Sequence, residues 1–274
     1  MFGTRLVIQP TAGLTFRRLP SSILHIATYP FLPPTTMSGF LRRLAIGASG
    51  RLPDDRETPT QRATTPAYYV LARDLVAMGA YSDDGAAWVH TTKRQGIRSF
   101  KHDAFSRIYR TAEQKEVYQL HDWDYLMCER LTGYVLSEDP SRLRELADVL
   151  NRGCKLGKEG FAFVAEVGEV REFRLARTAA SPSTVVPGDL LVGVPCDAFP
   201  LYRYDWGDGN DGDLASPTPS PVRGFVPFMA GFTDQPLEAE FYTDGEAFIP
   251  KALVDELRGD RGSGAEASPA RDPQ

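Results

Sequence analysis

The chain has few cysteines, and they do not occur in pairs. Its 274 residues include three of them, Cys128, Cys154 and Cys196, without any C-x-x-C motif. An odd number at these spacings argues against a disulfide framework and against a structural zinc site. The four histidines are scattered, with no H-E-x-x-H motif. We therefore predict no metal centre and interpret the cysteines as packed or idle thiols.

Long apolar runs are also absent. A membrane-spanning helix needs about 18 or more consecutive apolar residues, and the chain has no such run. Leu6-Val7-Ile8 is too short to be the apolar part of a secretory signal. We expect a cytoplasmic protein with no membrane partner.

Motifs of common enzyme classes are missing. There is no G-x-S-x-G nucleophile elbow. Segment 153–160 is not a P-loop, because its glycine spacing is one residue short and Glu159 replaces the Ser or Thr after the lysine. Segment 205–213 is acidic, but Gly212 stands at a calcium-ligand position and Pro219 where the bidentate Glu belongs. We predict no cofactor and interpret 205–213 as an acidic loop.

Positive and negative charges are unevenly distributed along the chain. Residues 1–110 contain 15 Lys and Arg against seven Asp and Glu, whereas residues 111–274 contain 16 against 29. The pI near 5.5 describes only the sum, and nucleic acid responds to local potential. The basic half can therefore line an RNA channel.

Segment 28–43 (T-Y-P-F-L-P-P-T-T-M-S-G-F-L-R-R) is the most informative part of the chain. Its three prolines hold the backbone extended. A helix is predicted to follow, with Thr35 or Thr36 as N-cap and Gly47 at its end. Its apolar face contains Met37, Phe40, Leu41 and Leu44.

The start of this helix suits an anion. Its open N–H groups, its dipole and the hydroxyls of Thr35, Thr36 and Ser38 favour negative charge. Arg42 and Arg43 are predicted to add positive charge on the face away from the core. A well-capped surface helix without a ligand is the alternative interpretation.

The same residues resemble the CRISPR-associated Cas-five family, whose members are RNA-binding subunits of type I surveillance complexes (Cascade). In that family a first strand leads through an arginine-bearing loop to a Tyr-Pro-Phe-x-Pro-Pro-Thr-Thr-x-x-Gly-like run. Here Leu6-Val7-Ile8 corresponds to the strand, Phe16-Arg17-Arg18 to the loop and residues 28–40 to the run. The resemblance is dense over residues 1–45 and diffuse afterwards.

Segment 93–102 (K-R-Q-G-I-R-S-F-K-H) is a second RNA candidate. Its cations can contact phosphates while an apolar ring stacks against a base, as in proteins that hold single strands. The alternative is a solvated hairpin, but the resemblance favours RNA, because related proteins project a thumb here. The residues that carry this prediction are Lys93, Arg94, Arg98, Phe100 and Lys101.

The glycine-rich segment 153–160 (G-C-K-L-G-K-E-G) is a third RNA candidate. Gly157 lets a ligand approach the backbone, and Lys155 and Lys158 supply charge. It resembles the glycine-rich loop of repeat-associated RNA-binding proteins. A tight turn without a ligand is the alternative.

The order of predicted elements indicates an α+β protein with a ferredoxin-like, RNA-recognition-type domain. Helices are predicted over 67–78 and from Asp139-Pro140 to near Gly153. Strands are predicted over 86–92, 116–122, 125–136, 161–167 and 170–175, with Trp123 between two of them and a turn at Gly168-Glu169. The predicted organisation is a domain over 1–186 with a β-hairpin thumb near 88–122, a β-rich extension over 187–257 and a disordered tail over 258–274.

The resemblance implies a non-catalytic subunit that caps the 5′ handle of a CRISPR RNA (crRNA). Its implied partners are the crRNA, the repeating backbone subunit, the large subunit and, through the complex, target DNA. One alternative is a metal-independent endoribonuclease that cuts repeat RNA, with candidate residues His25, Tyr29, Lys93 and His102. Another is a structural module without RNA contact. The predicted RNA-binding residues are Arg17, Arg18, Thr35, Thr36, Ser38, Arg42, Arg43, Lys93, Arg94, Arg98, Phe100, Lys101, Lys155, Gly157 and Lys158.

Overall fold

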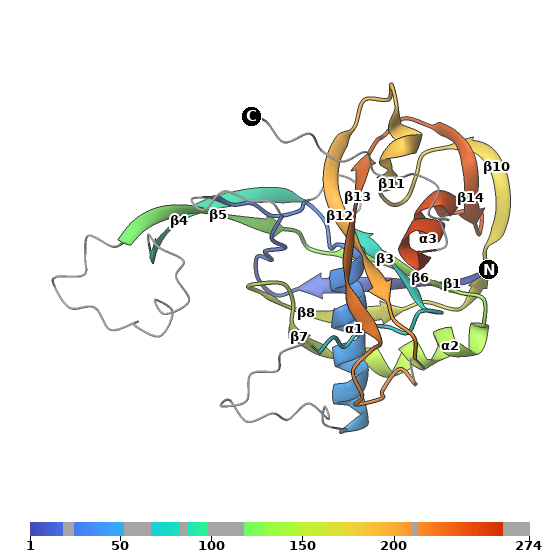
Figure 1. Ribbon diagram of the computed structural model, residues 1–274, viewed down its shortest axis with the longest axis horizontal. Coiled ribbons are helices and arrows are strands. Elements are labelled where there is room, and N and C mark those ends of the chain that lie inside the picture. The colour runs from blue at the N-terminus through green and yellow to red at the C-terminus, as the bar shows by residue number, and fades with distance from the viewer. Residues whose placement is uncertain (19–24, 52–66, 83–86, 98–117, 210–212, 260–274) are drawn as a thin grey trace.

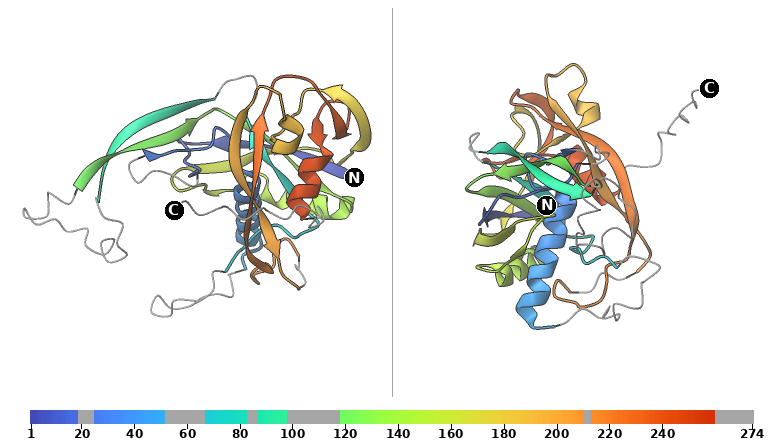
Figure 2. Two further views of the ribbon diagram at one scale, coloured as in Figure 1. Left: turned by 45° about the horizontal axis from the view of Figure 1, so that its top comes forward. Right: turned by 90° about the vertical axis from the view of Figure 1, so that its left-hand side faces the viewer.

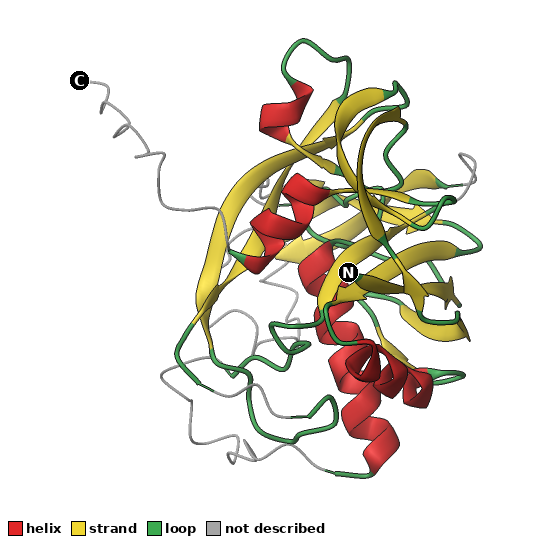
Figure 3. Cartoon of the chain, turned by 90° about the vertical axis from the view of Figure 1, so that its right-hand side faces the viewer, coloured by secondary structure: helices red, strands yellow, loops and turns green. Residues whose placement is uncertain are grey.

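A computed structural model describes residues 1–18, 25–51, 67–82, 87–97, 118–209 and 213–259. The fold is mixed α and β, and strands outnumber helices (Figure 3). None of the described helices is long and apolar enough to cross a membrane.

The largest sheet has the strand order β3-β6-β1-β8-β7, and each neighbouring pair is antiparallel. The strands in this order are β1 (Phe2–Pro10), β3 (Val76–Tyr81), β6 (Leu131–Ser137), β7 (Gly153–Lys155) and β8 (Phe161–Val167), and a sixth strand, β9 (Arg171–Glu172), also pairs with β1. The sequence predicted β1 and β8 correctly. The strand predicted over 170–175 is present in part, as β9 and the start of β10 (Arg174–Ala180), but its predicted return onto β8 is wrong, because β9 continues along β1 beyond β8.

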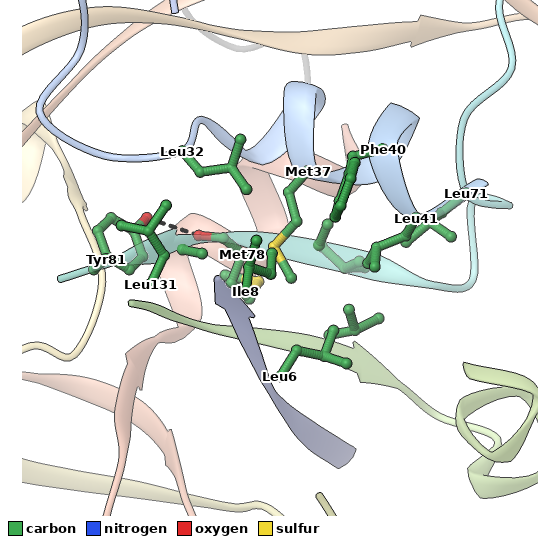
Figure 4. Packing of buried hydrophobic residues seen from close by; sticks show 14 of the residues in the cluster. Leu6, Ile8, Leu32, Met37, Phe40, Leu41, Leu71, Met78, Tyr81 and Leu131 are labelled. Atoms are coloured by element: carbon green, nitrogen blue, oxygen red, sulfur yellow. Dashed lines mark hydrogen bonds between the residues drawn. The ribbon is translucent and has the colours of Figure 1, made fainter. Parts of the chain in front are cut away.

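Helix α1 (Pro34–Ser49) packs its apolar side against this sheet (Figure 4). Met37, Phe40 and Leu41 are buried there with Leu6 and Ile8 of β1. Burial of such side chains stabilises the fold by about 1.5–3 kcal/mol each. The apolar residues at helical spacing in segment 37–44 therefore lie on the buried side of a helix, as predicted.

The ends of α1 differ from the prediction. Pro33 is the N-cap and Pro34 opens the helix, so neither Thr35 nor Thr36 caps it. Proline is favoured at this position because its missing N–H would have no helical partner. The helix also passes Gly47 and ends at Gly50, which has the left-handed φ of 69°.

The predicted helix over 67–78 is wrong, since residues 76–81 form strand β3. All six of its residues are buried, and periodicity cannot separate a fully buried strand from a buried helix. Gly79 does not end a helix. It lies at a register shift in the pairing with β6 at φ 83°, where a Cβ would be 2.8 Å from the Leu32 carbonyl oxygen.

Strands β4 (Trp88–Ile97) and β5 (Tyr118–Met127) form a long antiparallel hairpin that projects from the body (Figures 1 and 2). The prediction placed Trp123 between strands, but it lies within β5, and the break comes between Met127 and Leu131. The short strand β2 (His25–Ile26) pairs with β5 and joins the hairpin to the N-terminal segment.

Helix α2 (Pro140–Arg144) begins as predicted, with the Asp139 carboxylate accepting a hydrogen bond from the Ser141 N–H at 2.8 Å. A 3₁₀ helix (Glu145–Val149) follows it. Leu143, Leu146 and Val149 are buried, but Leu150 is exposed, and the helical segment ends at Val149, short of the predicted end near Gly153.

The C-terminal part forms two three-stranded sheets, β10-β14-β15 and β11-β13-β12. Helix α1 lies between the main sheet and the β12–β13 ribbon (Figure 2). One buried cluster contains residues from both parts, for example Phe31 and Phe199, whose ring centroids are 5.4 Å apart. The elements of this part are β10 (Arg174–Ala180), β11 (Val186–Pro187), a 3₁₀ helix (Gly188–Leu191), β12 (Asp197–Trp206), β13 (Val222–Phe232), β14 (Leu237–Thr243), β15 (Phe248–Pro250) and α3 (Lys251–Arg258).

Candidate nucleic-acid interface

A cavity of about 570 Å³ lies where the start of α1 meets three chain segments and strand β12. We call it the basic cavity, because among the described residues four cationic side chains and no acidic one line it. Its volume is within the range of about 300–1,000 Å³ found for ligand sites. The lining residues predicted from the sequence are Arg17, Thr35, Thr36, Arg43, Lys155, Gly157 and Lys158.

The first turn of α1 contributes polar groups to the basic cavity. Thr35 and Thr36 line it, and the first turn contains no acidic side chain. The Met37 N–H makes the first helical hydrogen bond, to the Pro33 carbonyl at 2.9 Å. The turn therefore presents N–H groups and hydroxyls at the positive end of the helix dipole, as an anion site requires.

The glycine-rich segment packs against the arginine-bearing loop. Gly157 has φ 73°, and a Cβ there would be 2.6 Å from the Thr15 carbonyl oxygen, which also accepts the Lys158 N–H at 2.9 Å. The close approach that glycine allows is thus to the protein backbone, not directly to a ligand. This packing places Lys158 near Arg17, and burial followed by the Arg17 charge lowers the pKa of the lysine.

The sequence predicted that Arg42 and Ser38 would be accessible to a ligand, and this is wrong, because both side chains are buried. The Arg42 side chain is completely buried and donates hydrogen bonds to the carbonyl oxygens of Asp213 and Ser216, the latter at 2.8 Å. The buried Ser38 hydroxyl accepts the Leu71 N–H at 2.9 Å. Both therefore anchor segments that cross α1. The neighbouring Arg43 is exposed and lines the basic cavity.

Arg18 lies outside the basic cavity. Its guanidinium stacks over the ring of Phe199, with 4.9 Å between its carbon and the ring centroid. Of the two arginines in this loop, Arg17 lines the cavity and Arg18 contacts the β12–β13 ribbon.

The β4–β5 hairpin contacts the edge of this site. Arg94 pairs with Glu159 at 2.5 Å and lies over the ring of Trp123 at 5.0 Å. Lys158 also lies over that ring, at 4.4 Å. Lys93 pairs with Asp122 at 3.3 Å. The other predicted hairpin residues, Arg98, Phe100 and Lys101, lie outside the described residues, as does His102.

Two of the candidate nuclease residues have clear environments. Tyr29 is buried, its hydroxyl donates to the Pro200 carbonyl at 2.5 Å, and burial raises its pKa to about 12. It is therefore unsuited to act as a base near neutral pH. His25 Nε2 is 2.8 Å from Oδ2 of the buried Asp124, whose Oδ1 accepts the Thr91 hydroxyl at 2.8 Å. This pair orients an exposed imidazole.

Sequence reasoning missed the aromatic side of the basic cavity. Tyr68 and Tyr202 line it, although neither belongs to a predicted RNA segment. The alternating aromatics Tyr202, Tyr204 and Trp206 in β12 were the available signal. That alternation indicates a strand, but only the folded chain brings one of these rings to the cavity.

No family model matches the chain, and no curated protein matches it. Among solved structures, a chain of the type III-B Cmr-beta complex bound to cognate target RNA and AMPPnP is 13% identical, with a TM-score of 0.38, over 85% of this chain and 86% of that one. A CRISPR protein from Archaeoglobus fulgidus is 10% identical, with a TM-score of 0.36, over 91% and 98%. A chain of a CRISPR RNA-guided surveillance complex is 15% identical, with a TM-score of 0.33, over 93% and 98%.

Proposed function

We propose that this chain is a non-catalytic subunit of a type I CRISPR surveillance complex and that its basic cavity holds the 5′ handle of the crRNA. The observation that carries the proposal is the convergence of Arg17, Arg43, Lys155 and Lys158 on one cavity, to which the described part of the chain contributes no acidic lining residue. Clustered cations beside an open helix start suit a chain of phosphates. The resemblance of residues 1–45 to the Cas-five family supports the identity of that RNA.

We also propose that the main sheet belongs to a ferredoxin-like unit. Elements β1, α1, β3, β6, α2 and β8 follow the order βαββαβ. Their strands are adjacent in the order β3-β6-β1-β8, all antiparallel. On this proposal the β4–β5 hairpin is a thumb inserted between the second and third strands, and residues 187–257 are a β-rich extension.

The proposed setting is a cytoplasmic ribonucleoprotein. Its other partners are the repeating backbone subunit, the large subunit and, through the complex, target DNA. Arg98, Phe100 and Lys101 are proposed to hold bases beside the handle.

Co-expression with the neighbouring genes and sequencing of the bound RNA tests the proposal. We expect crRNA of one length with a common 5′ end, and we expect Arg43→Glu to reduce its amount without changing its length. Arg144→Glu is the matched control, because Arg144 is an exposed helical arginine outside the basic cavity. Recovery of the complex without RNA, or with unrelated RNA, would reject the proposal.

The His25–Asp124 pair favours a second candidate, the metal-independent endoribonuclease. A carboxylate that holds an exposed imidazole is a common arrangement for a general base. We expect no discrete product when the protein is incubated alone with repeat RNA, with EDTA or with magnesium. A product that disappears in His25→Ala but persists in His90→Ala, an exposed histidine of the same three-stranded sheet, would replace the handle-binding assignment with a nuclease.

A further inference from the structure

The basic cavity has an aromatic side that phosphate binding alone does not require. Tyr68, in the segment before β3, and Tyr202, in β12, line the same cavity as the four cations. Both tyrosines are half-buried, so part of each side chain is accessible. The cavity thus offers flat rings as well as positive charge.

Packing beneath the two rings holds them in place. Phe225 of β13 lies edge-on to Tyr68, with centroids 5.3 Å apart, and edge-on to Tyr202 at 6.5 Å. Edge-to-face pairs of this kind favour a defined ring orientation. Phe225 is 44% exposed and is not among the residues that line the cavity, so its part is to support the two tyrosine rings.

Hydrogen bonds tie the Tyr68 segment to the C-terminal part. The Tyr68 carbonyl accepts the Ser220 N–H at 2.7 Å, and the Ser220 hydroxyl bonds both the N–H and the carbonyl of Val70, at 3.1 and 3.0 Å. Tyr202 lies within the paired region of β12, opposite Pro227. The two rings are therefore positioned before a ligand arrives, which lowers the entropic cost of binding.

We propose that Tyr68 and Tyr202 stack an unpaired base of the RNA whose phosphates contact Arg17, Arg43, Lys155 and Lys158. The inference rests on the proposed function and deepens it, because it assigns the site to single-stranded RNA with one base turned into the cavity. An acidic peptide or free phosphate uses the cations but not the rings. A base inside a duplex is stacked and paired, so its face is not available.

Fluorescence titration with a short single-stranded RNA that carries 2-aminopurine at successive positions tests this inference. We expect quenching at one position on binding to the full chain. Tyr202→Ala should abolish that quenching and weaken binding about 5- to 150-fold, the equivalent of the roughly 1–3 kcal/mol measured for base stacking. The salt dependence should not change, because no phosphate contact is lost.

Three variants separate stacking from loss of structure. Tyr202→Phe keeps the ring and should keep both quenching and affinity, whereas Tyr202→Leu fills similar space without a π face and should behave like Tyr202→Ala. Tyr242→Ala removes a half-buried tyrosine of β14 away from the cavity and should leave binding unchanged. Thermal unfolding of every variant checks that it is folded.

The outcomes distinguish this inference from the proposed function. If Tyr202→Leu binds and quenches like the unmodified chain while Arg43→Glu weakens binding, the stacking site is wrong and the phosphate site stands. Equal affinity for duplex and single-stranded RNA also overturns the stacking site. If the unmodified chain binds neither RNA, both proposals fail.

Discussion

Two cavities of the molecule both contain arginines but differ in what surrounds them. The basic cavity, about 570 Å³, is lined within the described ranges by four cationic residues and no acidic one. A second cavity, about 420 Å³, is lined by Arg5 and Arg171 together with four acidic residues. Arg171 pairs there with Asp244 at 3.4 Å and Glu246 at 3.1 Å, and Arg5 pairs with Glu166 at 3.2 Å. A phosphate entering the second cavity would meet a net negative charge, so the surroundings of an arginine decide what it can bind.

The neighbouring residues Arg42 and Arg43 also differ in their surroundings, since Arg42 is buried and Arg43 is exposed. The largest predicted effect is the difference in stability between variants at these two positions. Arg42→Ala should lower the free energy of unfolding by about 3–6 kcal/mol, because it removes two charge-assisted hydrogen bonds of about 1.5–3 kcal/mol each. Arg43→Ala should change it by about 0.5 kcal/mol or less, as exposed substitutions usually do. Urea denaturation measures both. Equal destabilisation by the two variants would contradict the anchoring role of Arg42.

Charge reversal compares the two cavities directly. Arg17→Glu combined with Arg43→Glu should weaken binding of single-stranded RNA about 100-fold, because two contacts of about 1.5 kcal/mol each are replaced by repulsion. The slope of log affinity against log salt should shrink by about 1.4, since each phosphate contact contributes about 0.7. Arg5→Glu with Arg171→Glu makes the same net charge change in the second cavity and should have little effect. Similar losses from both double variants would mean that only net charge matters.

Gly157 tests whether the shape of the basic cavity depends on backbone packing. Gly157→Val should cost at least about 1–2 kcal/mol of stability from its left-handed backbone alone, with more from the contact to Thr15. RNA binding should fall with it, because Lys155 and Lys158 lose their support. Lys158→Ala should leave stability nearly unchanged and weaken RNA binding less. Filter binding and thermal unfolding check that Gly157→Val loses more stability and more RNA affinity than Lys158→Ala. A Gly157→Val variant that binds RNA as tightly as the unmodified chain would contradict this prediction.

The smallest predicted effect is a pH dependence that arises from Lys158. Its pKa is lowered below 10.5 in the folded chain, first by burial and then by Arg17. The folded state then holds fewer protons than the unfolded state between those two pKa values, so this lysine's contribution to stability rises with pH through that window. A phosphate beside Lys158 favours its charged form, and RNA affinity should fall a few-fold as pH rises toward 10.5. Lys158→Arg, which stays charged, should flatten that decline. An identical profile in this variant would exclude Lys158 as the source.

Local sequence signals predicted several elements well. The apolar spacing of residues 37–44 predicted α1, Asp139-Pro140 predicted the start of α2, and the pattern over 161–167 predicted β8, and all three are present in the structure. Each of these signals acts within one or two turns or along one strand, so neighbouring residues are sufficient to specify it. The wrong prediction of a helix over 67–78 has the same cause. Residues 76–81 are buried by segments that are distant in the chain, and they form strand β3 although the local spacing over 67–78 is helical.

The sequence by itself determined that an extended, proline-rich segment enters a helix beside basic residues, because φ restriction, helix spacing and charge are local properties. It also placed Arg17, Arg43, Lys155 and Lys158 among the candidates. Only the tertiary structure decided that these four share a cavity with Tyr68 and Tyr202 while Arg42 is buried beneath the 213–216 segment. The physical reason is that the partners of each side chain come from segments far apart in the chain, and no local pattern specifies which distant carbonyl, ring or cation will be next to it.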